Sequence, residues 1–239
     1  MMSAIKVVLT GHSRGLGAAI AAELSGRGIP VLALARKRGA DMQGVTQVAL
    51  DLSDTAALSG WLAGGALESF LSGADRALLI NNAGMLQPVG PLSSHAPAEV
   101  AHAIGLNVAA PLMLAAAVAA IDGADRRVLH VSSGAGRNAY PGWAVYCASK
   151  AALDHHARAA ALDQSPGLRI VSLAPGVIDT DMQAQIRATD VERFPLRDQF
   201  EALKANGALA SPEDCAKRLL DFALSPAFGA AAVADLRDF

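Results

Sequence analysis

The chain has 239 residues, of which 52% are hydrophobic and 18% charged, with a formal net charge of −2. This composition excludes a disordered chain and offers no basic field for nucleic acid, so we expect one globular domain over residues 1–239. Two cysteines, Cys147 and Cys215, are too few for a disulfide framework or zinc site, and the apolar runs are shorter than a signal or membrane span.

These observations predict a cytoplasmic protein with neither a membrane nor a metal partner. Seven short apolar runs are predicted to be strands: 4–10, 30–35, 46–50, 77–81, 127–132, 169–174 and 233–236. Helical patterns lie between them, notably over 16–27, 97–120, 143–163 and 212–224. Continuous apolar strands joined by helices are typical of a parallel sheet covered on both faces. The sequence therefore predicts an α/β fold, a single-domain doubly wound (Rossmann) parallel sheet of about seven strands.

The segment 179–207 interrupts this alternation. It carries mixed charges and little helical pattern, and it lies just before the last predicted helix. An insertion at this place predicts a helical lid over an active site. A helical hairpin on the surface is the alternative.

A glycine-rich turn, TGHSRGLG at 10–17, connects the first strand to the first helix. Gly11 permits a tight turn, Gly15 lets backbone amides approach a pyrophosphate, and Gly17 lets the helix pack close to the strand. The helix N-terminus adds partial positive charge. The turn is predicted to bind a dinucleotide through Gly11, Ser13, Arg14, Gly15, Leu16 and Gly17. A purely structural turn is the alternative.

The residues after the second strand indicate which dinucleotide. Arg36, Lys37 and Arg38 stand where a carboxylate would hold a ribose without a 2′-phosphate. Arg14 and Arg36 are predicted to clamp a 2′-phosphate, which favours NADP(H) over NAD. A solvated run of charges is the alternative. Asp51, after the third strand, is predicted to contact the adenine amino group or else to cap a helix.

Tyr146 and Lys150 are spaced to project from one face of the predicted helix 143–163. A nearby ammonium favours the phenolate, so the pair is predicted to form an acid/base group. Ser133 ends the fifth strand, at the edge where doubly wound sheets bind ligands. Asn107 is a poor helix former inside a long predicted helix, which indicates a polar task. An exposed tyrosine beside a solvated lysine is the alternative for the pair.

These motifs together resemble the short-chain dehydrogenase/reductase family. The matches run nearly end to end: TGHSRGLG at 10–17, Asp51-Leu52, NNAG at 81–84, Asn107, Ser133, YCASK at 146–150 and PGVIDT at 175–180. The resemblance implies that Tyr146 is the acid/base, that Ser133 orients the carbonyl, and that Lys150 binds the nicotinamide ribose and lowers the tyrosine pKa. It also implies that Asn107 completes a proton relay. Further cofactor contacts are implied for Leu52, Asn81, Ala83, Gly84, Pro175, Gly176, Ile178 and Thr180.

The C-terminal third, from PGVIDTDMQAQIRATD onwards, resembles the sepiapterin and benzil reductases of this family. Sepiapterin reductases grip the pterin with a carboxylate near the C-terminus, and Asp235 aligns with it only if one residue is inserted. The family is often dimeric or tetrameric, which implies a homodimer or homotetramer.

An apolar wall around a substrate is predicted from Met85, Gln87, Tyr140, Trp143, Met182 and Phe194. Such a wall favours a flat, weakly polar substrate, although the same side chains would also serve to pack the lid. We expect NADPH-dependent reduction of a small aromatic or vicinal-dicarbonyl ketone. The alternatives are an NAD-dependent alcohol dehydrogenase and a non-enzymatic nucleotide-sensing scaffold.

Overall fold

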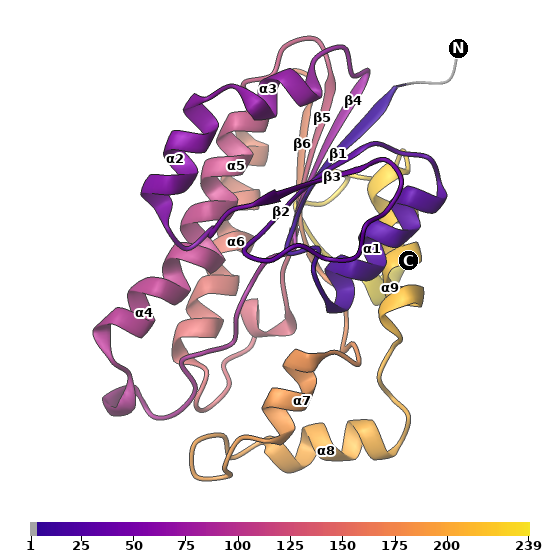
Figure 1. The fold of residues 1–239 in the computed structure, drawn as a ribbon. Coiled ribbons are helices and arrows are strands. Elements are labelled where there is room, and N and C mark those ends of the chain that lie inside the picture. The colour runs from indigo at the N-terminus through magenta and orange to yellow at the C-terminus, as the bar shows by residue number, and fades with distance from the viewer. Residues whose placement is uncertain (1–3) are drawn as a thin grey trace.

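The computed structural model describes residues 4–239, and its centre is one parallel sheet in the order β3-β2-β1-β4-β5-β6-β7 (Figure 1). Every neighbouring pair of strands is parallel. The predicted doubly wound sheet of seven strands is therefore confirmed. The strands are β1 Ile5–Thr10, β2 Val31–Ala35, β3 Val45–Ala49, β4 Arg76–Asn81, β5 Asp125–Val131, β6 Leu168–Ala174 and β7 Val233–Asp235.

Helices cover both faces of the sheet. In Figure 1, α1 and α9 lie on one side of it and the helices from α2 to α6 on the other. The bounds are α1 Gly15–Gly26, α2 Thr55–Ala63, α3 Ala66–Leu71, α4 Pro97–Ile104, α5 Ala110–Ala119, α6 Ala144–Leu162, α7 Asp181–Arg187, α8 Arg197–Ala205 and α9 Pro212–Leu224.

The alternation of side chains along β1 explains the two cores. Val7 and Leu9 are buried in the cluster that includes Leu219 of α9. Val8 points to the opposite face and is buried with Leu114 of α5. Successive residues of a strand face opposite sides, so a run of apolar residues is needed where both faces are covered.

The predicted helix 97–120 is present, but a π-helical turn at Gly105–Ala109 joins α4 to α5. A Cβ on Gly105 would lie 2.8 Å from the carbonyl oxygen of Ser53, so the helix passes very close to the loop after β3. The stretch Pro97–Ala119 is long and apolar enough to cross a membrane. Its inner side packs on the sheet through Leu114 and Val118, which accounts for that apolar composition.

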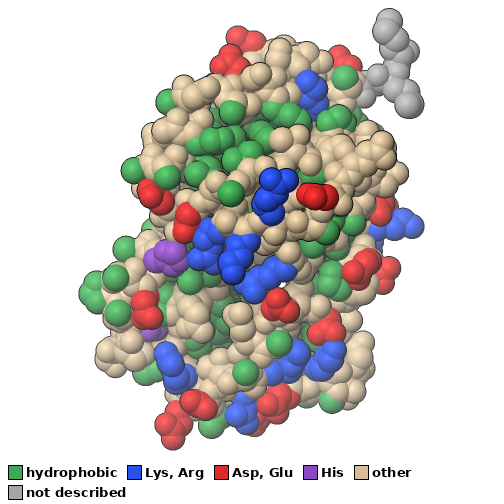
Figure 2. All heavy atoms as spheres, viewed as in Figure 1, with side chains coloured by type: hydrophobic (Ala, Val, Ile, Leu, Met, Phe, Trp, Pro, Cys, Tyr) green, Lys and Arg blue, Asp and Glu red, His purple; other side chains and the backbone are tan. Residues whose placement is uncertain are grey.

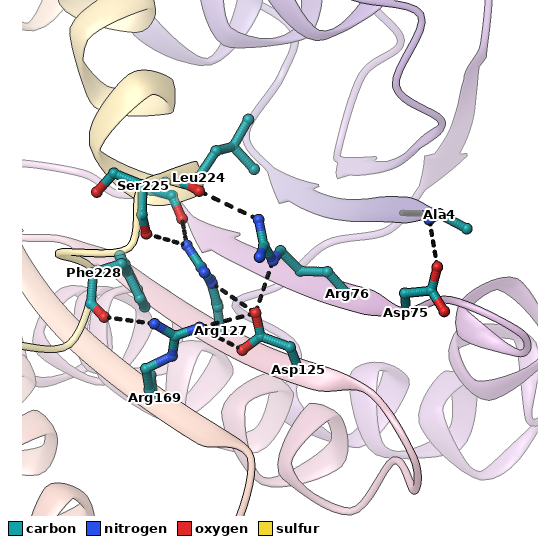
Figure 3. Close-up of polar contacts among 10 residues, drawn as sticks. Ala4, Asp75, Arg76, Asp125, Arg127, Arg169, Leu224, Ser225 and Phe228 are labelled. Carbon is teal, nitrogen blue, oxygen red and sulfur yellow. Dashed lines mark hydrogen bonds and ion pairs between the residues drawn. The ribbon is translucent and has the colours of Figure 1, made fainter. Parts of the chain in front are cut away.

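A network of ion pairs holds the amino edge of the sheet (Figure 3). Asp125, at the start of β5, accepts hydrogen bonds from Arg76 and Arg169, at 2.8 Å each, on the two neighbouring strands. Buried Arg127 bonds to the same carboxylate and donates to the carbonyls of Ala223 and Ser225, at the end of α9. The pKa of Asp125 is lowered: burial opposes this, but the hydrogen bonds and charges of the arginines outweigh it. The network thus ties β4, β5 and β6 to the end of α9.

The carboxyl ends of the strands point towards α7 and α8, which form a separate layer (Figure 1). The segment 179–207 is helical in these two stretches, as predicted, and it is called the lid below. Phe194, between them, is fully buried against Trp143, which precedes α6. The lid therefore packs on the segment that leads into the helix of Tyr146 and Lys150.

Candidate active site

The glycine-rich turn between β1 and α1 meets the loop after β4. Gly11 has a φ of +74°, and a Cβ there would lie 2.8 Å from the Cα of Ala83. A Cβ on Gly17 would overlap the carbonyl oxygen of Gly11. Only glycine fits either position, and a tight turn that leads into the amino end of a helix is what a dinucleotide site requires.

Asn82, rather than Asn81, ties these two segments together. Its Nδ2 donates to the carbonyls of Thr10 at 3.0 Å and Gly11 at 3.2 Å. The side chain of Asn81 is buried and directed into the protein, where it bonds to His130 and to the carbonyl of Pro111. Asn81 therefore faces the interior with its side chain, and the cofactor contact expected of this residue stays a prediction. The NNAG pattern alone does not distinguish the two asparagines.

The basic segment after β2 is held beside the glycine-rich turn. Gln47 of β3 accepts hydrogen bonds from His12 Nε2 and from the backbone N–H of Gly39, both at 2.8 Å. A Cβ on Gly39 would lie 3.3 Å from the Cα of Ser13. Arg36 and its two basic neighbours are exposed, and Figure 2 shows Lys and Arg side chains gathered near the middle of this face. The contact between His12 and Gln47 joins residues 35 positions apart and leaves no local signal in the sequence.

Arg14 lies between the turn and the lid. Its guanidinium is 3.4 Å from the carboxylate of Asp181, the first residue of α7, and both side chains are about two-thirds exposed. The methyl group of Thr180 would be 3.4 Å from a Cβ on Gly15. The loop after β6 thus borders the same turn. The side chain of Ile178 is part of the core, which leaves its backbone for a cofactor.

Asp51 lies beyond the carboxyl end of β3, next to buried Leu52. Its carboxylate accepts from the backbone N–H of Ser53 at 3.0 Å and from its hydroxyl at 2.6 Å. Burial opposes ionisation, but these bonds and the charge of Arg36 hold the pKa of Asp51 below its usual value. The helix cap is Asp54, which accepts from Ala56 and Ala57. Asp51 is therefore not that cap.

Tyr146 and Lys150 are both buried on the inner face of α6, with Lys150 Nζ 5.6 Å from the centre of the tyrosine ring. The ammonium donates to the carbonyl of Val131 at 2.8 Å. Burial lowers the pKa of Lys150 to about 8, against the charge of Asp154. Burial raises the pKa of Tyr146 to about 12, while a hydrogen bond with Ser133 acts in the opposite direction. With its pKa raised in this way, the phenol is protonated at neutral pH.

Asn107 lies in the π-helical turn and binds the loop after β4. Its side chain accepts from the backbone N–H of Met85 at 2.9 Å and donates to the carbonyl of the same residue at 2.8 Å. A Cβ on Gly84 would lie 3.4 Å from Asn107 Oδ1 and 3.7 Å from Lys150 Nζ. The loop after β4, the π turn and Lys150 therefore meet at one point, and π turns are frequent at functional sites.

An apolar cluster covers Tyr146. Trp143 stacks on Phe194 of the lid with ring centres 4.5 Å apart, and it contacts Tyr146 edge-on at 5.6 Å. The cluster contains four of the six predicted wall residues: Tyr140, Trp143, Met182 and Phe194. Met85 and Gln87 lie outside it, and the exposed Gln87 accepts from the backbone N–H of Val89 instead.

One donor in this cluster is unpaired. The buried Nε1 of Trp143 has no hydrogen-bond partner among residues 4–239. Leaving such a group unpaired costs about 1–3 kcal/mol, so a ligand that accepts this bond would gain from it.

The arrangement has known relatives. The short chain dehydrogenase family model matches residues 6–191. A benzil reductase ((S)-benzoin forming) of Bacillus cereus is 34% identical over 230 residues, 89% of this chain and 91% of the relative. A sepiapterin reductase of Meriones unguiculatus is 34% identical over 252 residues, 97% of this chain and 95% of the relative.

The fold agrees with these sequence matches. The crystal structure of a short-chain dehydrogenase/reductase from Burkholderia vietnamiensis is 47% identical, covers 100% of both chains and superposes with a TM-score of 0.71. The glycine-rich turn, the Tyr146–Lys150 pair and these matches agree along the whole chain. The chain therefore belongs to the short-chain dehydrogenase/reductase family of nicotinamide-dependent oxidoreductases.

Proposed function

We propose that the protein uses NADPH to reduce an aromatic vicinal dicarbonyl compound to a hydroxyketone. The observation that carries this proposal is a buried tyrosine beneath an aromatic wall: Tyr146 contacts Trp143, which stacks on Phe194 of the lid. A flat aromatic substrate would take up the same stacking contacts. The similarity to benzil reductases supports this substrate class.

The glycine-rich turn and the exposed Arg36 fit a dinucleotide with a 2′-phosphate. Backbone amides at the start of α1 would hold the pyrophosphate, and Lys150 would hold the nicotinamide ribose. When bound, the reduced nicotinamide supplies the hydride that the carbonyl carbon accepts.

Residues of the chain supply the proton for the carbonyl oxygen and orient the carbonyl group. The hydroxyl of Tyr146 donates its proton to the carbonyl oxygen, and Ser133 donates a hydrogen bond to the same oxygen. Burial keeps the pKa of Tyr146 at about 12, so the phenol is available as a donor over the neutral range.

Trp143 provides a reason to favour two adjacent carbonyl groups. Its Nε1–H is buried without a partner among the described residues and lies in the wall beside Tyr146. The second oxygen of a dicarbonyl substrate would accept this bond. Because Trp143 and Phe194 are in contact, the lid must move for the substrate to enter.

The C-terminal carboxylate disfavours a pterin. Asp235 accepts from Arg237 Nε at 2.8 Å and from a second nitrogen of the same guanidinium at 2.7 Å. Arg137 lies 3.7 Å away on another side. The hydrogen bonds from Arg237, with the charge of Arg137, hold the pKa of Asp235 low despite burial. This carboxylate is already paired, so it would have to exchange partners before it could bind pterin amino groups.

Initial rates with NADPH and with NADH test the proposal on benzil, 1-phenyl-1,2-propanedione, acetophenone, sepiapterin and a sugar ketone. We expect the two diketones with NADPH to be reduced fastest, because an adjacent carbonyl makes its neighbour a better hydride acceptor. No turnover of either diketone at millimolar concentration, or a preference for the sugar, would reject the substrate class. Faster rates with NADH would reject the cofactor assignment alone.

A further inference from the structure

A buried carboxylate lies one helical turn beyond Lys150. Asp154 is 1% exposed. Its Oδ1 accepts from the hydroxyl of Ser132 at 2.8 Å and from that of Ser172 at 2.7 Å. Its Oδ2 accepts from Arg137 Nε at 3.2 Å. A buried charge is retained only when it is paired and hydrogen-bonded, and this one is both.

The partners of Asp154 lead directly to the candidate active site. Ser132 immediately precedes Ser133, and the turn that follows, Gly134–Gly136, packs on α6 so closely that a Cβ on Gly136 would lie 3.0 Å from Asp154 Oδ2. On its own helix, Asp154 follows Lys150 by four residues and therefore lies on the same face. One carboxylate thus contacts the Ser133 turn and lies on the same face of α6 as the buried Lys150.

We propose that Asp154 is a positioning residue: its carboxylate fixes the turn that carries Ser133 and supplies the negative charge that keeps the Lys150 ammonium in place. Arg137 completes the arrangement from outside, because it also donates to the carbonyl of Ala234 on β7 at 2.8 Å and approaches Asp235. The edge strand is thereby linked to the same carboxylate.

The charges around this pair determine the expected pH behaviour. The ionisable groups around Lys150 and Asp154 include Tyr146 on α6, His130 on β5, Arg137 after β5 and Asp235 on β7. Burial lowers the pKa of Lys150 to about 8, and the charge of Asp154 opposes that fall. Removing the carboxylate should lower the lysine pKa further. Removing Arg137 should raise it, because a nearby positive charge is lost while the carboxylate remains.

Two variants with opposite expected shifts test this inference. Asp154→Asn keeps a side chain of the same size, and Arg137→Gln changes a residue that is partly exposed. Cofactor affinity is measured by fluorescence titration from pH 6 to 10, and it should fall at alkaline pH as Lys150 loses its proton. We expect the midpoint of this fall, the alkaline limb, to move about 0.5–1 pH unit lower in Asp154→Asn and to move higher in Arg137→Gln. A purely structural role would not shift the two variants in opposite directions.

Variants of Ser132 and Ser172 distinguish the effect of the Asp154 charge on Lys150 from its effect on the turn that carries Ser133. Ser132→Ala keeps the carboxylate but frees the turn, so we expect kcat to fall about fivefold or more with an unchanged pH profile. Ser172→Ala on β6 is the matched control. It removes an equally short hydrogen bond to the same oxygen without touching the turn, so kcat should stay within about twofold of the wild type.

The rates rest on the proposed function, but the binding titration does not, because it needs no substrate and uses whichever nicotinamide cofactor binds more tightly. If diketones are not turned over while the opposite shifts appear, the substrate proposal fails and this inference stands. The inference is overturned if Arg137→Gln leaves the alkaline limb unmoved, or if Ser132→Ala and Ser172→Ala have equal rates. All three variants keep the Asp154 carboxylate, so these measurements remain decisive even if Asp154→Asn does not fold.

Discussion

Gly142 and Arg193 are in direct backbone contact: a Cβ on Gly142 would overlap the carbonyl oxygen of Arg193. Gly142 precedes α6, and Arg193 belongs to the lid. Arg193 also donates to the carbonyl of Val89 at 2.8 Å, while the N–H of Gly90 donates to the carbonyl of Gly142 at 2.9 Å. Three loops that lie far apart in the sequence therefore interlock over Tyr146, and the closed lid depends on a residue with no side chain.

Gly142→Ala should prevent the lid from closing. The substitution introduces a clash with a backbone oxygen, and it also places alanine at a φ of +78°. We expect kcat/KM to fall at least about tenfold, because the aromatic wall no longer seats against Tyr146. Gly207→Ala is the matched control. It has a φ of +65° and no atom within 4 Å of the added Cβ, so it carries the backbone cost without the clash. Equal kcat/KM values in the two variants would contradict the role of the contact.

The sheet and the lid could be predicted from the sequence because their signals are local. Runs such as Pro30–Ala35 predicted strands to within one or two residues, and the irregular segment 179–207 predicted the lid. The π turn around Asn107 could not be predicted, since a shifted helical hydrogen bond leaves no periodic pattern. The hydrogen bond between His12 and Gln47 joins residues 35 positions apart, and only the assembled sheet brings them together.

Arg36→Asp should change the choice of cofactor. A charge-assisted contact with a 2′-phosphate contributes about 1.5–3 kcal/mol, and the introduced carboxylate would repel the phosphate. We expect NADPH affinity, measured by fluorescence titration, to fall at least about tenfold while NADH affinity holds or rises. Arg38→Asp makes the same charge change two residues away, next to Asp41. If both variants lose NADPH affinity equally, the effect is one of net charge rather than of a specific contact.

Tyr146→Phe should remove the proton donor and leave the fold intact. The phenylalanine ring preserves the edge contact with Trp143, so the melting temperature and cofactor affinity should stay near those of the wild type. Turnover of the best diketone should fall about 10²-fold or more, the usual scale for a positioned proton donor. Tyr140→Phe removes a hydroxyl from the chain's other tyrosine in the same cluster. A comparable loss in that variant would show that the cluster was perturbed and that no specific donor was lost.

Trp143→Phe should distinguish the hydrogen bond of Trp143 to the second carbonyl from its stacking in the aromatic wall. It retains a ring that stacks on Phe194 but removes the Nε1–H that lacks a partner among residues 4–239. The loss of one hydrogen bond corresponds to about 1 kcal/mol, so kcat/KM for benzil should fall about five- to tenfold, with a smaller change for acetophenone. The melting temperature should hold despite the smaller ring, because a buried unpaired donor is removed. An equal change for both ketones would assign Trp143 to packing alone.

His130 should make the protein less stable in acid. It is fully buried on β5, with its two nitrogens 3.1 Å from Asn81 Nδ2 and from His156 Nδ1. Burial, with the charges of His156 and Lys150, lowers the pKa of His130 to about 3. The unfolded chain therefore binds a proton that the folded protein excludes between about pH 6.5 and 3, and the free energy of unfolding falls as pH falls through that range.

Because of His130, the free energy of unfolding should be about 2 kcal/mol lower at pH 5 than at pH 7, by the linkage between pKa and stability. Urea unfolding at both pH values measures the loss. His130→Gln offers an acceptor to Asn81 and a donor to His156 without titrating, so its loss between pH 7 and pH 5 should be smaller than that of the wild type. His155→Gln, at an exposed position on α6, should lose as much stability as the wild type. Because the acidic groups that also titrate, such as Asp125, are common to all three proteins, an equal loss in His130→Gln would show that His130 is not the group that the acid protonates.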